Sequence, residues 1–196
     1  MSIHKQLIRG LLAFSLLSPV LLAASASAET ENPIRWVTGG AVWSTPQEAM
    51  KTFLDTGAIT DRGLQGGLKR SGWTADEVRA GLNKSYNVDF LRLSNFLYSP
   101  AGEAYLTDQT RSYVPYWTLR TWAIQALRSA IILDAADGSI SGAGIMSQLP
   151  VDFRIDNSTP FDGKQNVAAQ ANCKDNAQCT SLFSWFVFLP AQLASR

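Results

Sequence analysis

The longest helical pattern in the sequence lies between Pro115 and Ala136. Within it, apolar side chains recur at intervals of three and four residues, so one face of a helix would be apolar along its length. At 1.5 Å per residue, a helix of this span is roughly 33 Å long, about the diameter of a small domain. We therefore expect it to run through the middle of the domain. The apolar positions are Leu119, Trp122, Ala123, Ala126, Leu127, Ala130 and Ile131.

Shorter helices are expected on both sides of this central one, because the sequence marks where they begin and end. Thr45 and Thr74 each precede an acidic residue by three positions, a capping box that satisfies free N–H groups of a first helical turn. Ser99-Pro100 favours another start, and Gly57 and Gly138 are typical stop signals. The predicted helices are 46–56, 61–70, 74–82, 88–98, 100–106 and a short one ending at Gln148.

Extended segments are predicted near both ends of the domain. Residues 34–43 read as an extended stretch around a glycine pair, and apolar residues alternate with polar ones over 151–155. Leu182 to Leu189 is aromatic and β-branched, which favours a buried strand or a segment that covers a sheet. The predicted fold is therefore mainly α, a compact bundle of four to six helices around one long central helix, with minor β-structure at the two ends of the mature chain.

Residues 1–28 have the three parts of a secretory signal peptide. Two basic residues precede an apolar run over 11–22, and small residues at 26–28 form a cleavage site. The apolar run is shorter than the roughly 20 residues that a membrane-spanning helix needs. We therefore expect cleavage near Ala28, export to the periplasm or another extracytoplasmic space, and a single domain over residues 29–196.

The only two cysteines, Cys173 and Cys179, lie close together in the polar part of residues 156–196. In an exported protein this arrangement predicts a disulfide that closes a small loop. Such a short loop contributes roughly 2 kcal/mol, enough to fix a local excursion but not a domain.

Cleavage of the signal peptide would also remove His4, the only histidine of the chain. A Ser-His-Asp triad, a Cys-His pair and a histidine metal site would then be excluded, so neither a metal nor a cofactor is expected. The net charge changes from +1 to −1 when Lys5 and Arg9 are lost, and no cluster of basic residues stands out. Nucleic acid is therefore not an expected partner.

Three pieces of the sequence carry a resemblance to a known family. Phe96 to Glu103 contains a Ser-Pro break followed by Gly-Glu, Leu127 to Asp137 contains a Leu-Arg helix, and Leu149-Pro150 leads into the strand at 151–155. With these pieces, residues 49–155 resemble the helical N-terminal domain of unknown function of secreted, largely cyanobacterial α/β-hydrolase-like proteins.

The resemblance implies a helical domain that precedes a catalytic hydrolase domain. The chain ends where that second domain would begin, and it has no G-x-S-x-G motif for a nucleophile. We therefore expect a helical domain without the hydrolase activity, of a kind that acts in trans as a cap or docking module.

Aromatic residues supply the candidate binding surface, because tryptophan and tyrosine are enriched at binding hot spots. Trp36 and Trp43 flank the glycine pair and are predicted to be exposed. Tyr113, Tyr116 and Trp117 lie near the start of the long helix and are further candidates. Core packing is predicted for Trp122, which falls on the apolar face.

The predicted function is an exported, non-catalytic binding or scaffold domain that contacts a protein partner, such as a hydrolase or another envelope protein. One alternative is a carboxylate-based hydrolase of cell-envelope glycans, although Asp134 and Asp137 are more typical of helix capping. The other is a peripheral membrane module that inserts Leu182 to Leu189 into a membrane surface.

Overall fold

The computed structural model describes residues 33–38, 41–71, 73–110, 113–115, 120–149, 153–156 and 183–196. The predicted signal peptide, the glycine pair, Tyr116, Trp117 and the two cysteines lie outside the described residues. Predictions made for them remain predictions.

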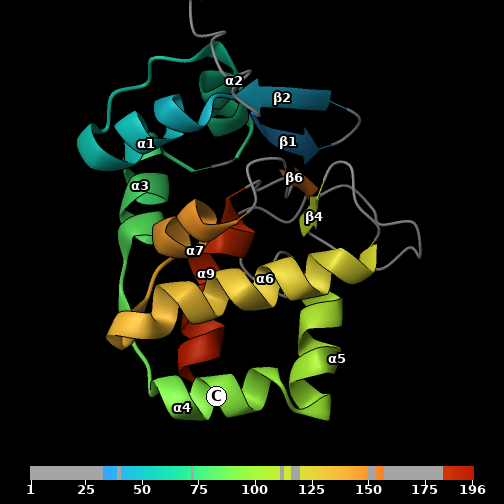
Figure 1. Cartoon of the computed structure of the whole chain (residues 1–196). Coiled ribbons are helices and arrows are strands. Elements are labelled where there is room, and N and C mark those ends of the chain that lie inside the picture. Colours follow the sequence, from blue (N-terminus) through green and yellow to red (C-terminus); the bar gives the residue numbers. More distant parts are fainter. Residues whose placement is uncertain are drawn as a thin grey trace, which may run out of the picture. The chain divides into compact units, whose positions relative to one another are not determined.

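Most of the described residues are helical, so the predicted mainly α fold is confirmed (Figure 1). Short strands accompany the helices. The helices are α1 (Gln47–Thr56), α2 (Arg62–Arg70), α3 (Ala75–Asn83), α4 (Phe90–Leu97), α5 (Pro100–Gln109), α6 (Arg120–Asp134), α7 (Gly142–Gln148) and α9 (Ser184–Ala194), with a 3-10 turn at Ala135–Asp137. The strands are β1 (Ile34–Thr38), β2 (Ala41–Thr45), β3 (Tyr86–Asn87), β4 (Tyr113–Pro115), β5 (Ser139–Ile140) and β6 (Phe153–Asp156).

Several helix ends form as their capping residues predict. The Thr74 hydroxyl accepts a hydrogen bond from the Glu77 amide at 3.2 Å, and the Glu77 carboxylate accepts one from the Thr74 amide, which completes a capping box. Ser99 caps α5 through the Gly102 amide. Gly57 and Gly138 end their helical segments with φ of 83° and 87°, left-handed conformations that glycine adopts without a side-chain penalty.

The capping box predicted at Thr45 is wrong. Its hydroxyl is buried and accepts a hydrogen bond from the indole N–H of Trp36 at 3.0 Å. Pro46 takes the cap position of α1 without a side-chain hydrogen bond. A buried indole N–H requires a hydrogen-bond acceptor. Here the acceptor is the Thr45 hydroxyl, which therefore does not cap α1.

Two strands from distant parts of the chain form the middle of a mixed sheet in the order β2-β1-β6-β4. β1 and β6 run parallel, whereas β2 and β4 pair antiparallel with them at the edges. Trp36 of β1 lies opposite Trp43 on one side and Ile155 on the other. β3 and β5 form a separate pair in the middle of the chain, so β-structure is not confined to the two ends as predicted.

The long helix does not include Pro115, contrary to the prediction. Tyr113–Pro115 pairs with β6 as β4, and the described part of the helix, α6, spans Arg120–Asp134. Proline has no backbone N–H to donate to a neighbouring strand. It is tolerated on an edge strand, which has a neighbour on one side only. The buried face of α6 contains Ala123, Leu127, Ala130 and Ile131 as expected, but Trp122 is 59% exposed. The prediction of core packing for Trp122 is therefore wrong.

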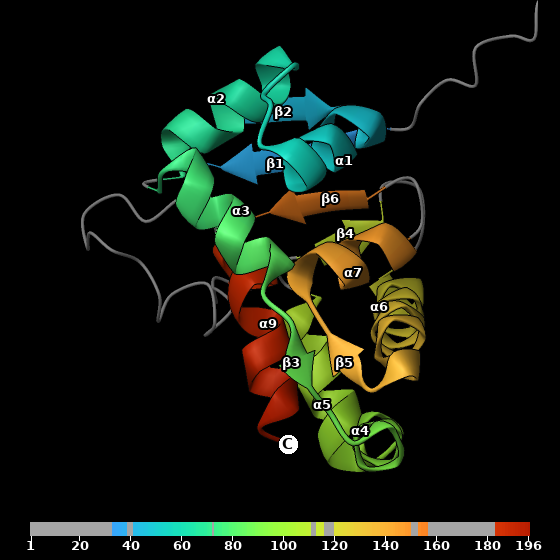
Figure 2. The same cartoon turned by 90° about the vertical axis from the view of Figure 1, so that its left-hand side faces the viewer.

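Of the two predictions for residues 182–189, the buried strand is wrong: the segment is a helix, α9, whose aromatic residues pack against the sheet. Figures 1 and 2 show it beside α3, and it also packs against α7 and β3. Because it is buried around most of its circumference, its sequence lacks the polar face that would reveal a helical period. Aromatic and β-branched composition was therefore misleading.

Aromatic contacts tie α9 to the sheet and to α5. Phe183 lies 4.7 Å from the ring of Trp36, centroid to centroid. Trp185 stacks on Tyr113 at 6.0 Å and 3° between planes, and its indole donates a hydrogen bond to Gln109 at 2.9 Å. These interactions make α9 a part of the core.

The apolar side chains of α9 are consequently not available to a membrane surface, contrary to the predicted alternative. Phe183, Trp185, Phe186 and Leu189 are fully buried. Within the ranges that the structure describes, no helix combines the length and the apolar character needed to cross a bilayer.

Phe186→Ala should lower the free energy of unfolding by about 3–5 kcal/mol, because it leaves a cavity in the centre of the core. Urea denaturation of the variant and the wild type measures this change. Ser195→Ala, at the exposed end of α9, is the matched control and should change the free energy by less than about 0.5 kcal/mol. Equal effects of the two substitutions would contradict the burial of α9.

Candidate functional site

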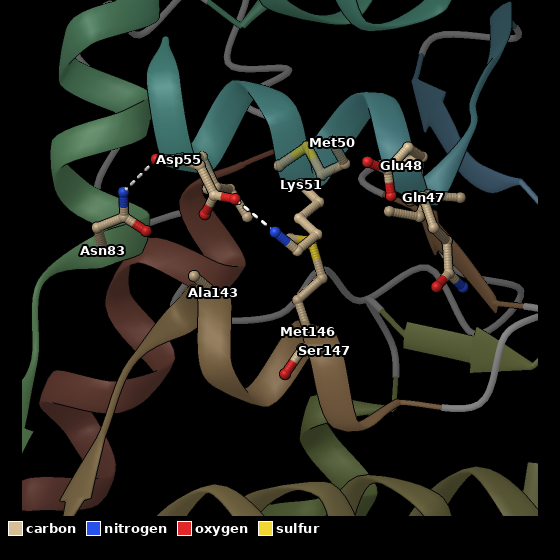
Figure 3. Close-up of a pocket in the computed structure, with 11 residues that line it drawn as sticks. Gln47, Glu48, Met50, Lys51, Asp55, Asn83, Ala143, Met146 and Ser147 are labelled. Atoms are coloured by element: carbon tan, nitrogen blue, oxygen red, sulfur yellow. Dashed lines mark hydrogen bonds and ion pairs between the residues drawn. The ribbon is translucent and has the colours of Figure 1, made fainter.

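A pocket opens between α1 and α7, bounded also by β1 and the end of α3 (Figure 3). Its volume is about 380 Å³, near the lower end of the range for small-molecule sites. Apolar side chains form its floor and polar ones its rim. The floor residues are Ile34, Met50, Leu54, Ala143 and Met146, and the rim residues are Gln47, Glu48, Lys51, Asp55, Asn83 and Ser147.

The amphipathic pattern of α1 produces one side of the floor. Met50 and Leu54 are one turn apart and therefore lie on the same face of the helix. Met146 approaches from α7 and is 5% exposed, while Met50 is 2% exposed. Methionine is unbranched and polarisable, so a floor with two thioethers can adapt to apolar groups of different shape.

Side chains of α3 hold the end of α1 in place beside the pocket. Arg79 Nε and Asn83 Nδ2 each donate a hydrogen bond to the Leu54 carbonyl at 2.9 Å, and Arg79 Nη2 donates to the Asp55 carbonyl at 2.6 Å. The last carbonyls of a helix have no partners within it and carry partial negative charge. The Arg79 guanidinium therefore donates hydrogen bonds to these carbonyls and places a positive charge beside them. These contacts fix α1 against α3.

The charged side chains of the pocket lie at its mouth. Lys51 Nζ donates to Asp55 Oδ2 at 2.5 Å, and both side chains are more than half exposed. The hydrogen bond and the charge of Asp55 raise the pKa of Lys51. In Figure 3, Lys51 lies between Glu48 and Asp55 along α1. An exposed pair of this kind contributes little to stability.

Asp134, at the end of α6, positions α7 and thus the second wall of the pocket. Its Oδ2 accepts a hydrogen bond from the Ser141 amide at 2.9 Å, and the Ser141 hydroxyl in turn accepts from the Gly144 amide. A Cβ atom on Gly144 would lie 1.8 Å from Asp134 Oδ1, so a larger residue there would displace this carboxylate. Burial raises the pKa of Asp134, the Ser141 amide opposes this shift, and Asp137 adds to it.

The two acids at the described pocket rim, Glu48 and Asp55, are not spaced as a glycosidase pair. Glu48 and Asp55 are seven positions apart on α1, which separates them by about 10 Å along the axis. Glycosidases need their two carboxyl groups at about 5–9.5 Å. Asp137 accepts hydrogen bonds from the backbone and hydroxyl of Ser139, as expected of a capping residue.

A nucleophile is likewise not activated at the pocket. The Ser147 hydroxyl donates to the Gly144 carbonyl at 2.7 Å instead of to a base. In the part of the chain that the structure describes, no group of three or more histidine, cysteine, aspartate or glutamate side chains could hold a metal ion. The described lining of the pocket thus combines an apolar floor with a polar rim, and its serine hydroxyl is engaged with a backbone carbonyl.

The structure does not bring the predicted aromatic residues together on an exposed surface. Trp36 is fully buried against Phe183, so its predicted exposure is wrong. Trp43 is half-buried because α2 packs on β2: a Cβ atom on Gly66 would lie 2.3 Å from the indole nitrogen of Trp43. Glycines in α2 allow this approach.

Tyr113, the third described candidate, is also buried, because Trp185 stacks on its ring. Among the described residues, exposed large apolar side chains occur on β2, after α1, on α4 and its C-cap, and on α6. They are Val42, Ile59, Phe90, Leu91, Tyr98, Trp122 and Leu133.

The residues that carried the family resemblance form a structural connection. Arg128 of α6 donates to the Leu97 carbonyl at 3.1 Å, pairs with Glu103 of α5, and lies over the ring of Tyr98. Gly102 lets α5 approach the end of α4, since a Cβ atom there would lie 1.9 Å from the Phe96 carbonyl oxygen. These residues join three helices and do not reach the pocket.

Comparison with known proteins agrees with this resemblance. Residues 38–156, more than half of the chain, match the family described as alpha/beta hydrolase of unknown function (DUF1400). The chain belongs to this family. Among curated proteins and among solved structures, nothing matches. The DUF1400 match ends at β6, so α9 lies outside the matched residues.

The pocket was not predicted from the sequence. Met50 and Leu54 look like ordinary core positions of an amphipathic helix, and Met146 lies in a short segment without a clear period. Only one signal pointed to it: the chain has three methionines, and two of them line the pocket.

Asp134→Asn tests whether this carboxyl acts structurally at α7. Its raised pKa means that folding favours the protonated form, so stability from this group is present at low pH and lost as pH rises through the folded pKa, above the usual value near 4. The stability of Asp134→Asn relative to wild type should therefore increase between about pH 3 and pH 6.

Urea unfolding at several pH values measures this difference. Asp76→Asn, at an exposed position of α3, is the control for general effects of removing a carboxylate. A difference between Asp134→Asn and wild type that is constant with pH would contradict the assignment.

Proposed function

We propose that this chain is a non-catalytic binding domain that holds an apolar side chain of a protein partner in the pocket between α1 and α7. The observation that carries the proposal is the division of this pocket into an adaptable apolar floor and a charged rim. Pockets of this kind accept the buried anchors that dominate protein interfaces, while the rim supplies orientation.

Two observations on the described lining of the pocket support a non-catalytic role: its two acids are far apart, and its serine does not contact a base. The rim carboxylates Glu48 and Asp55 lie too far apart along α1 for glycosidase chemistry. Ser147 has its hydroxyl engaged with a backbone carbonyl. The described sheet also has just one parallel pair, β1 and β6, whereas an α/β hydrolase is built on a mostly parallel sheet.

The family description suggests the class of partner. Because DUF1400 is described as alpha/beta hydrolase of unknown function, a hydrolase or another envelope protein is the partner that we propose. With the predicted signal peptide, the two proteins would meet in the periplasm or another extracytoplasmic space. The domain would act there as a docking module.

Site-specific photo-crosslinking in the source organism tests the proposal. A benzophenone amino acid at position 147, on the pocket rim, should give a defined adduct with one protein, while the same group at position 125, on the exposed face of α6, should not. Ala143→Leu fills part of the pocket and should reduce the adduct about tenfold, the effect of roughly 1.4 kcal/mol.

Gln125→Leu is the matched control for Ala143→Leu, since it adds a similar side chain away from the pocket. It should leave the adduct at position 147 unchanged. Adducts of equal yield from positions 147 and 125, or an adduct that Ala143→Leu does not reduce, would contradict binding through the pocket.

A further inference from the structure

We infer that a second copy of this chain docks on the exposed face of α6, with the two α6 helices antiparallel. This inference goes beyond the proposed function, because it concerns a surface outside the pocket. It starts from Trp122, which the sequence predicts in the core and which the structure leaves 59% exposed. Leu133, near the other end of the same helix, is 57% exposed.

The exposed apolar side chains belong to one straight stripe along α6. Trp122, Ala126, Ser129 and Leu133 are separated by four, three and four positions, which places them within about 60° of one another around the helix axis. None of the three charged residues of α6 falls on this stripe. An exposed helix face normally carries charged side chains, so this face has the character of an interface.

The position of α6 makes this stripe accessible to another protein. The helix lies along the outside of the domain in Figure 1 and is seen end-on near the right-hand edge of the domain in Figure 2. Ser129, in the middle of the stripe, is exposed, and Ala126 beside it is half-buried. A second helix could therefore lie along the whole stripe.

The order of side chains on the stripe fits a second copy, because it is nearly the same in both directions. The large side chains are at its ends and the small ones in its middle. About a twofold axis, Trp122 of one copy would face Leu133 of the second copy, and Ala126 would face Ser129. The small central residues let the helices approach closely, and each large side chain packs at an end.

The charges at the ends of α6 favour the antiparallel orientation. No acidic residue lies in its first turn and no basic residue in its last, although a helix dipole favours both. Instead, Asp134 is the last residue of α6, and the exposed Asp137 follows it in the 3-10 turn. An antiparallel copy brings the positive end of one helix beside the negative end of the other. A parallel copy would bring like ends together.

The size of this face predicts a weak dimer. At 1.5 Å per residue, α6 is about 22 Å long, so two such faces bury less than the roughly 1,200 Å² of a stable interface. We expect a dissociation constant of about 100 µM. At low concentrations in a cell this dimer is sparse, so position 125, beside the stripe, still serves as the crosslinking control.

Sedimentation equilibrium of the purified chain, from about 10 µM to about 1 mM, measures the dimer. The average mass should rise from that of one chain toward that of two. Trp122→Glu and Leu133→Lys should each weaken association at least about tenfold, because each places a charge on the stripe. Val42→Thr is the matched control: it alters an equally exposed apolar side chain, 59%, on β2, and should change nothing.

An equimolar mixture of Trp122→Glu and Leu133→Lys tests the orientation. In an antiparallel dimer of the two variants, the introduced glutamate faces the introduced lysine at one end, and the original Trp122–Leu133 contact remains at the other. The mixture should therefore associate several-fold more tightly than either variant alone. A chain that stays single at about 1 mM would overturn the inference. So would equal dimerisation of Trp122→Glu and Val42→Thr, or a mixture no tighter than its components. None of these outcomes bears on the pocket.

Discussion

Burial of α9 is the constraint on which the rest of the structure depends. Phe183 packs on Trp36 of the sheet, Trp185 stacks on Tyr113 and bonds to Gln109, and Phe186 contacts Phe153. One short helix thus joins both central strands to the helices around them. Full burial of such large aromatic side chains stabilises a domain strongly.

The geometry of the pocket depends on this packing. Gly142 places α7 against α9 so closely that a Cβ atom would lie 2.4 Å from the Phe186 carbonyl oxygen. Asp134 fixes the start of α7 from the other side, and Arg79 and Asn83 fix the end of α1. Both pocket walls are therefore held by contacts with α3, α6 and α9. A binding site built on helices fixed in this way is pre-organised, which lowers the entropic cost of ordering the site when a ligand binds.

Local signals predicted local structure well and long-range packing poorly. The capping box at Thr74, the serine cap at Ser99 and the glycine stops at Gly57 and Gly138 depend on neighbouring residues, and all are confirmed. The Thr45 cap, the exposure of Trp36 and the strand at residues 182–189 failed for one shared reason. In each case a partner from a distant part of the chain decides the outcome: Trp36 takes the Thr45 hydroxyl, and the core surrounds Trp36 and α9. The pocket could not be predicted either, because it forms where α1 and α7 meet.

The central claim is that a helix beyond the family-matched residues completes the core. The most direct test compares the chain with a form that lacks residues 183–196, by following tryptophan fluorescence through urea denaturation. Our account predicts that the shortened form loses its cooperative transition and exposes apolar surface. It also predicts that a peptide of residues 183–196 restores the transition. A shortened form that unfolds with the midpoint and slope of the intact chain would contradict the account.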